Sequence, residues 1–258
     1  QGYEYILMEL RKAKAPSLHL EDYNYWFNKG IQEYVNERYN HFAKTQQLSD
    51  DLQALTTSTI LTLNYFINPP TVTYTAQYTG SYVENPVPVT TGKRYGSDFI
   101  QFAAPRNYWH FLGSHVTSKT IRPYKCHPAG YAINTTSKRL TADIANGIIN
   151  NAYLKPGHER PYHSFADGTG AATRPDFLYF IGDLSKFGIS DITIDYLKEP
   201  SKINLTVSQR DLPIDTSEVL EFPEYVCNEI IKRVVKLVLE VSSDPRLGTN
   251  PQVNNSIT

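Results

Sequence analysis

The stretch EFPEYVCNEIIKRVVKLVLEVSSDPRL, residues 221–247, has the most apolar helical pattern in the chain and is the element around which we expect the fold to form. Pro223 suits the first turn of a helix, where a backbone N–H is not needed, and Pro245 ends the pattern. Apolar side chains recur at helical spacing in two adjacent rows: Val226, Ile230, Val234, Leu237 and Val241 in one, and Cys227, Ile231, Val235, Val238 and Leu239 in the other. The pattern predicts a helix over residues 223–241 that is covered on most sides, either by the rest of the chain or by another subunit.

Two further helical patterns precede a change of period. Residues 5–14 predict a short helix that Pro16 ends, and residues 22–42 predict a long one, with apolar side chains near helical spacing. After Leu55 the period changes from 3.6 to 2. The runs TLNYFI (62–67) and TVTYTAQYT (71–79) alternate apolar and polar residues, as half-buried strands do.

The middle of the chain predicts short strands separated by loops and one helix. We expect an exposed excursion at 80–96, strands at 99–102, 108–116 and 131–134, a helix at 142–154 and a long loop at 155–175. Further strands are expected at 177–181, 192–196 and 203–207. The predicted fold class is α+β, with the N- and C-terminal helices packed as a bundle and a central antiparallel β domain. The corresponding divisions are N-terminal bundle helices at 1–56, a β-rich domain with one inserted helix at 57–213, the C-terminal bundle helix at 214–247 and an extended tail at 248–258.

The composition argues against a protein that grips nucleic acid. The chain has 258 residues and a formal net charge of −1, so it generates no strong positive field. It contains 19 Tyr and 11 Phe but a single Met. Tyrosine offers a large contact area with a polar tip, and is therefore common in extracellular binding proteins and in proteins that bury surface against neighbours.

The two cysteines indicate no disulfide framework. Cys227 lies in the apolar helical pattern, which predicts a buried thiol and suits a reducing compartment, and Cys126 is far from it in the sequence. We recognise no signal peptide, transmembrane run or lipidation motif in the sequence, and we expect no membrane partner.

No group of residues matches a strong catalytic or metal-binding pattern. His158, Glu159 and His163 lie close together, but Gly157 and Pro161 keep them off the helix that a zinc peptidase motif needs. We therefore favour exposed loop residues over metal ligands.

Four other sets of residues favour ordinary structural roles. Cys126 and His127 are adjacent, so on a strand their side chains point to opposite faces and do not pair as nucleophile and base. Asp50 and Asp51 suit the start of a helix better than a carboxylate pair. Residues 168–170, GTG, lack the Lys-Ser/Thr of a phosphate loop. A loose basic group consists of Arg122, Lys125, Lys138 and Arg139. We favour solvated surface charge over a nucleic-acid-binding face for this group. We predict no catalytic residues, no cofactor and no metal.

Three segments together resemble one family of virion proteins. They are NYWFNKGIQEYVNERYNHFAKTQQLSDDLQAL (24–55), ITIDYLKEPSKINL (192–205) and the stretch 221–247. Their texture and order resemble the ring proteins of the head-to-tail connector of crAss-like tailed phages. The resemblance covers both ends of the chain and the last strands, and it contains no catalytic or binding motif.

The resemblance implies a structural protein of the virion that is not an enzyme. Copies of the chain would form a ring below the portal, in contact with adjacent portal, ring or tail proteins, after assembly in the host cytoplasm. The ring would enclose a channel through which genomic DNA passes without sequence-specific binding. The tail at 248–258 is expected to become ordered on docking to a neighbour. The alternative is a tail-associated or adhesion-type glycan-binding module that uses Trp109 and the loop at 80–96.

Overall fold

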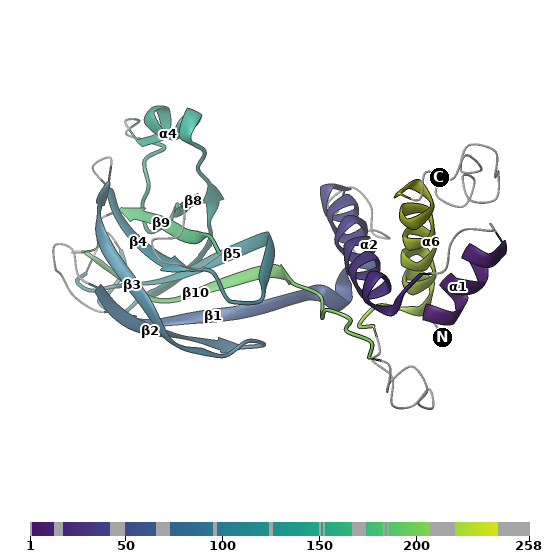
Figure 1. Cartoon of the computed structure of the whole chain (residues 1–258). Helices are drawn as coiled ribbons and strands as arrows, with labels where there is room; N and C mark the ends of the chain where they lie inside the picture. Colours follow the sequence, from purple (N-terminus) through teal and green to yellow (C-terminus); the bar gives the residue numbers. More distant parts are fainter. Residues whose placement is uncertain are drawn as a thin grey trace. The chain divides into compact units, whose positions relative to one another are not determined.

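The computed structural model describes residues 2–12, 18–41, 50–65, 73–94, 97–123, 126–149, 151, 153–166, 174–182, 184, 186–206 and 220–241. The chain divides into two compact units (Figure 1). One contains residues 1–55 and 199–258, and the other contains residues 56–198. Each unit is described by itself.

The second unit is a ten-stranded mixed sheet that forms a nearly closed barrel. The neighbouring strands follow the order β6-β5-β10-β1-β2-β3-β4-β9-β8-β7. The strands are β1 Thr56–Tyr65, β2 Thr73–Gly80, β3 Glu84–Arg94, β4 Ser97–Ala103, β5 Tyr108–Thr120, β6 Ala132–Thr136, β7 Lys138–Arg139, β8 Tyr162–Ala166, β9 Asp176–Gly182 and β10 Phe187–Lys198.

The two strands at the ends of this order, β6 and β7, are consecutive in the sequence and are separated only by Ser137. β6 pairs antiparallel with β5, and β7 pairs parallel with β8. The amide of Lys138 donates to the carbonyl of Pro161 at 2.9 Å, and that of Leu140 donates to the carbonyl of His163 at 2.7 Å. One continuous segment, residues 132–140, therefore joins both edges of the sheet.

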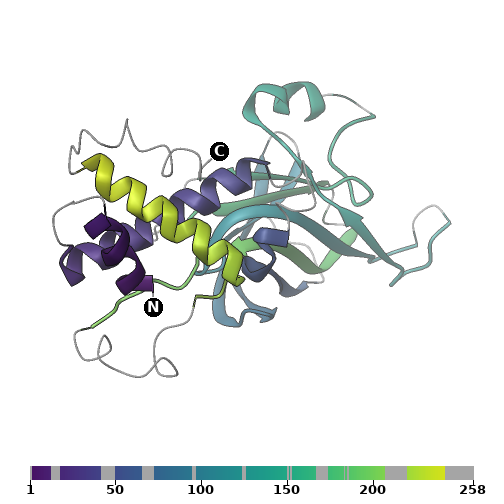
Figure 2. The same cartoon turned by 90° about the vertical axis from the view of Figure 1, so that its right-hand side faces the viewer.

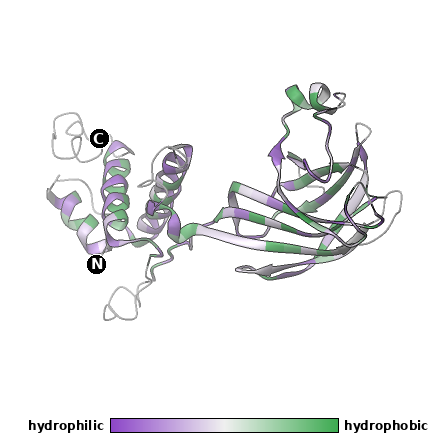
Figure 3. Ribbon diagram, turned by 180° about the vertical axis from the view of Figure 1, so that it is seen from behind, coloured by the Kyte–Doolittle hydropathy of each residue, from purple (hydrophilic) through white to green (hydrophobic). Residues whose placement is uncertain are grey.

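The interior of the barrel is filled by side chains. Alternation along the strands, visible in Figure 3, turns one set of residues inward, as the period-2 pattern requires. Large aromatic rings occupy the space, with Phe102 stacked on Tyr179 at a centroid distance of 5.6 Å. This core comprises Leu61, Leu63, Ala76, Tyr78, Val87, Val89, Ile100, Phe102, Ala104, Val116, Phe177, Tyr179, Ile181, Leu184, Ile189, Ile192, Ile194 and Tyr196.

Helix α4, Ala142–Ile149, packs on the outside of this barrel. It covers a small second core that consists of Leu140, Ala145, Tyr162, Leu178 and Phe180, with Phe99 and Ile148 against it. Strand β9 consequently has apolar side chains buried on both of its faces.

The first unit is built from helices α1 (Gly2–Lys12), α2 (Leu20–His41) and α6 (Glu224–Val241), with a 3₁₀ turn η1 at Gln53–Leu55. Figure 2 shows α6 lying across α1 and α2. Val226, Ile230 and Val234 of α6 are fully buried. The helix expected over residues 223–241 is therefore confirmed, and it is covered within its own unit along this row.

The predicted fold class is wrong. We expected a helical bundle with a central antiparallel β domain, whereas the described structure is mostly a mixed sheet that forms a nearly closed barrel, with only a few helices. The parallel pair β7–β8 makes the sheet mixed, and residues read as loops supply strands that close it. Local periodicity shows which residues alternate, but it does not show that β6 and β7 meet the two edges of one sheet.

The exposed excursion expected at 80–96 is also wrong, because most of it is β3. The loop was predicted from Pro86 and Pro88, because proline has no backbone N–H to donate to a neighbouring strand. Pro88 pairs with Thr75 of β2 and Pro86 lies at an irregularity of the β2–β3 register, while the pairing of β3 with β4 covers only Val89 to Arg94. A missing N–H is tolerated where a strand has one neighbour, so the prolines fit where they lie.

Of the strand expected at 203–207, residues 203–206 are instead an extended segment that lies along α2, and residue 207 lies outside the described residues. The side-chain amide of Asn28 donates to the carbonyl of Ile203 at 2.8 Å and accepts from its N–H at 2.9 Å. Asn24 makes the same pair of bonds with Leu205, at 3.0 and 2.9 Å. Two asparagines therefore pair with this segment as a neighbouring strand would.

Candidate functional site

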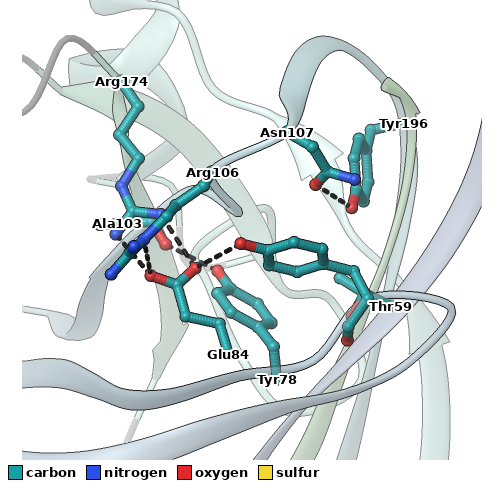
Figure 4. Close-up of polar contacts among 9 residues, drawn as sticks. Thr59, Tyr78, Glu84, Ala103, Arg106, Asn107, Arg174 and Tyr196 are labelled. Carbon is teal, nitrogen blue, oxygen red and sulfur yellow. Dashed lines mark hydrogen bonds and ion pairs between the residues drawn. The ribbon is translucent and has the colours of Figure 1, made fainter. Parts of the chain in front are cut away.

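A cluster of charged and phenolic side chains lies at the end of the barrel where β3 begins and β4 ends (Figure 4). Glu84 is at its centre. Arg174 meets the carboxylate with two parallel bonds of 3.0 Å, and Nε of Arg106 donates to Oε1 at 3.0 Å. The hydroxyl of Tyr82 donates to Oε2 at 3.4 Å. We call Glu84, Arg106, Arg174 and Tyr82 the Glu84 cluster.

The Glu84 cluster holds a buried carboxylate in its charged form. Burial acts to raise the pKa of Glu84, but the hydrogen bonds and charges of Arg174 and Arg106 outweigh it and leave the pKa lowered. Burial and the neighbouring carboxylate raise the pKa of Tyr82, and burial raises that of Tyr78 well above its ordinary value. The phenols are therefore neutral donors.

This arrangement ties loops together. The Tyr78 hydroxyl donates to the carbonyl of Ala103 at 2.7 Å, and the Tyr196 hydroxyl donates to Asn107 at 2.8 Å. Both guanidiniums are engaged with the carboxylate, and the phenols are neutral. Its effect is to pin the β2–β3 turn, the β4–β5 loop and the approach to β9.

A second polar cluster lies where the barrel closes. Ser137 hydrogen-bonds with the hydroxyl of Ser114 on β5 and, at 2.8 Å, with Nδ1 of His163 on β8. Burial, and then the charge of Arg139, lower the pKa of His163 to about 4. Nε2 of His163 is buried with no hydrogen-bond partner in the described part of the chain.

The three residues weighed as metal ligands do not converge. His158 and His163 are both buried, not exposed loop residues as expected. The ring of His158 stacks on Phe187 at a centroid distance of 3.7 Å, while His163 is held by Ser137. Within the described residues no group of three or more His, Cys, Asp or Glu is placed to hold a metal.

The remaining predicted positions have structural surroundings. Cys126 is exposed, and the ring of its neighbour His127 stacks on Tyr131. Cys227 is half-buried, and burial raises the pKa of its thiol. Trp109 is half-buried on β5, stacked on His110 at 5.3 Å. Lys125, residues 168–170 and the tail 248–258 lie outside the described residues.

Asp51 is a buried acceptor within the helical unit. It is only 2% exposed and accepts from the hydroxyls of Tyr225 at 2.9 Å and Tyr34 at 3.4 Å, with Nε of Arg38 at 3.6 Å. The carboxylate therefore links α2, the turn before η1 and α6. From the sequence we predicted only that Asp51 lies at the start of a helix. Its contacts with Tyr34, Arg38 and Tyr225 could not be predicted, because these residues are distant from Asp51 in the sequence.

Several large apolar side chains remain exposed in both units. Tyr153 is 89% exposed, Val83 65% and Tyr25 61%. Tyr25 stands beside Trp26 in an edge-on arrangement on α2. The others are Tyr5, Met8 and Tyr225 in the helical unit, and Ile60, Tyr131, Ile144 and Leu154 in the barrel unit.

In the described part of the chain, no helix is both long and apolar enough to cross a membrane. A scan against models of known protein families finds no match. A search of curated protein sequences likewise finds no match.

Proposed function

We propose that this protein is a structural virion protein whose copies form a ring in the head-to-tail connector of a tailed phage. The resemblance of residues 24–55, 192–205 and 221–247 to the ring proteins of crAss-like phages suggests this function. Its partners are then further copies of the chain and the adjacent portal, ring or tail proteins. It acts without catalysis and without contact with a membrane.

The observation that carries the proposal is the exposure of large apolar side chains in both units. Each subunit of a ring contacts a neighbour on either side, through two different patches. Such patches are enriched in aromatic residues, and Tyr153 at 89% exposed and Tyr25 at 61% exposed belong to different units. Burying them on assembly removes apolar surface from water, at about 25 cal/mol per Å².

The filled barrel constrains where DNA passes. Tyr78, Phe102 and Tyr179 occupy its interior, so a single chain provides no channel. The channel is therefore enclosed between several copies. A net charge of −1 suits such a wall, because DNA bound by many basic side chains would be held rather than released.

Neither Trp109 nor the loop at 80–96, the two candidates for the glycan-binding alternative, favours it. Glycan recognition by stacking needs an exposed aromatic platform, and Trp109 is half-buried beside His110. The loop expected to support it, residues 80–96, is mostly strand β3.

Native mass spectrometry of the purified protein, alone and mixed with its portal protein, tests ring formation. We expect a closed oligomer of one stoichiometry. Tyr153→Ser and Tyr25→Ser should weaken it while leaving the melting temperature of the subunit unchanged, since both side chains are exposed. Gln77→Ser, at an exposed position of β2, is the matched control and should assemble normally.

A protein that stays monomeric at every concentration, with and without the portal protein, would contradict the proposal. Rings that form equally well with both tyrosine variants would show that other surfaces make the contacts and would remove the observation on which the proposal rests.

A further inference from the structure

A pocket of about 340 Å³ lies on the outside of the barrel, beside the start of α4. Its polar lining is basic and hydroxylic, from Arg94, Arg139, Thr141 and Ser164, and none of the described residues that line it is acidic. Its apolar floor includes Leu140 and Phe180, which belong to the small core under α4. The floor is therefore a fixed surface rather than a gap between loops.

Arg139 is the residue that gives this pocket its chemistry. Its guanidinium lies over the ring of Phe165, 5.6 Å from the centroid, which orients the group at the pocket wall. No carboxylate of the described residues pairs with Arg139. Arg106 and Arg174, by contrast, both form ion pairs with Glu84. A planar guanidinium presents donors in a fork that fits the oxygens of a phosphate or carboxylate.

The start of α4 does not provide the site by itself. Asp143, in its first turn, accepts a hydrogen bond from the hydroxyl of Thr141, and the pKa of its carboxyl is lowered by that bond and by bonds from backbone N–H groups. The carboxylate of Asp143 therefore already accepts hydrogen bonds from the N–H groups at the start of α4. An incoming anion would rely on Arg139 and the hydroxyl of Ser164.

The dimensions indicate a small ligand. Pockets for small molecules run from about 300 to 1,000 Å³, so this one is at the lower limit. It has room for one phosphate group with a compact organic part on the floor. The pocket belongs to the barrel unit alone, so the inference does not depend on ring formation.

We propose that this pocket binds a small phosphate monoester. The phosphate accepts from the guanidinium of Arg139 and from the hydroxyl of Ser164. The organic part rests on Leu140 and Phe180. The site is a binding site, and no bond is made or broken in it.

Isothermal titration calorimetry with phenyl phosphate, inorganic phosphate and phenol tests the proposal. Phenyl phosphate should bind saturably at one site per chain, inorganic phosphate more weakly, and phenol not at all. Arg139→Gln should weaken binding about tenfold or more, the value of a hydrogen-bonded charge of this kind. Lys138→Gln removes the same charge one residue away, outside the pocket lining, and should leave the affinity within about twofold.

A second variant separates the cavity from its charge. Ala142 is exposed at the first position of α4 and lines the pocket, so Ala142→Phe fills space without changing any charge. It should weaken phenyl phosphate binding more than binding of inorganic phosphate. The proposal is overturned if the unmodified protein shows no saturable binding, or if Lys138→Gln reduces affinity as much as Arg139→Gln, since that would be unspecific attraction to surface charge.

Discussion

At the scale of single residues, the charged side chains that matter most are those whose partners come from distant parts of the chain. Glu84 meets Arg106 and Arg174, which lie 22 and 90 positions away. The sequence shows three charges, but the pairing depends on strand neighbours, so no local spacing could have predicted it. The same holds for His163 and Ser137, which meet because β7 pairs with β8.

Replacing Glu84 should destabilise the barrel more than replacing an exposed carboxylate. Glu84→Gln removes the negative charge and one of the two acceptor oxygens that the two guanidiniums share, which should lower the free energy of unfolding by about 1–3 kcal/mol. Glu199→Gln, which breaks the exposed pair with Lys202, is the control and should change it by less than about 0.5 kcal/mol. Urea unfolding measures both, and equal losses would contradict a special role for the Glu84 cluster.

His163 should make stability depend on pH in a defined window. Burial and the charge of Arg139 lower its pKa from 6.5 to about 4, so between these values it is neutral when folded and charged when unfolded. The unfolded state then binds more protons, and the free energy of unfolding falls as pH falls from 6.5 to 4, by up to about 3 kcal/mol, and no further below that.

The control is a side chain that does not titrate. His163→Gln can keep a hydrogen bond to Ser137, so its stability should fall less across this window than that of the unmodified protein. The second control is His127→Gln, which replaces a half-buried ring stacked on Tyr131. Its free energy of unfolding should fall across this window as much as that of the unmodified protein. Parallel curves for His163→Gln and the unmodified protein would show that His163 does not set this dependence.

At the scale of elements, periodicity predicted the type of most segments. The helix α6 follows from its two apolar rows, and the alternation in residues 71–79 marks β2. The errors occur where a local signal has two meanings. Pro86 and Pro88 indicated a loop but lie in β3. Residues 203–206 alternate like a strand, but Ile203 and Leu205 pair with asparagine side chains instead.

Gly30 permits the close contact between α2 and α6. A Cβ added there would lie 2.5 Å from Cγ2 of Val234, a β-branched side chain with little freedom to move. Gly30→Ala should therefore destabilise the protein by about 1–3 kcal/mol, although alanine favours helix. Gly147→Ala in α4, where the added Cβ meets nothing within 4 Å, should instead stabilise by up to about 1 kcal/mol.

Thermal unfolding of these variants checks this contact, and a second substitution makes the test specific. Adding Val234→Ala to Gly30→Ala removes the clashing methyl groups and should make the second change cost less than it does alone. Purely additive effects in the two variants would rule out the contact as the cause.

Asn24 and Asn28 should control the protection of the segment that they bind. One helical step of four residues rises about 6 Å, and two residues of extended chain span about 6.6 Å, so the asparagines match alternate residues of the segment. Asn28→Ala removes both the acceptor of the Ile203 N–H and the donor to the Ile203 carbonyl. Hydrogen exchange at Ile203 and Leu205 should accelerate, whereas Asn40→Ala, at an exposed position of α2, should leave it unchanged. Unchanged exchange in both variants would contradict this role.

At the scale of the whole molecule, closure of the sheet was beyond prediction from the sequence. It depends on residues 132–140 meeting β5 on one side and β8 on the other, a relation between segments that no periodicity expresses. The pocket beside α4 was missed for the same reason, since Arg94, Arg139 and Ser164 come from three strands. Arg139 itself was noted, but only as part of a loose basic group.

The central claim is that this chain is a ring subunit, and electron cryomicroscopy of the native phage particle tests it most directly. We expect a closed ring of identical copies at the head-to-tail junction. The barrel unit and the helical unit should each fit the density of every copy. We also expect that the channel runs between copies and not through the filled barrels. Particles whose head-to-tail junction contains no copy of this chain would contradict the account.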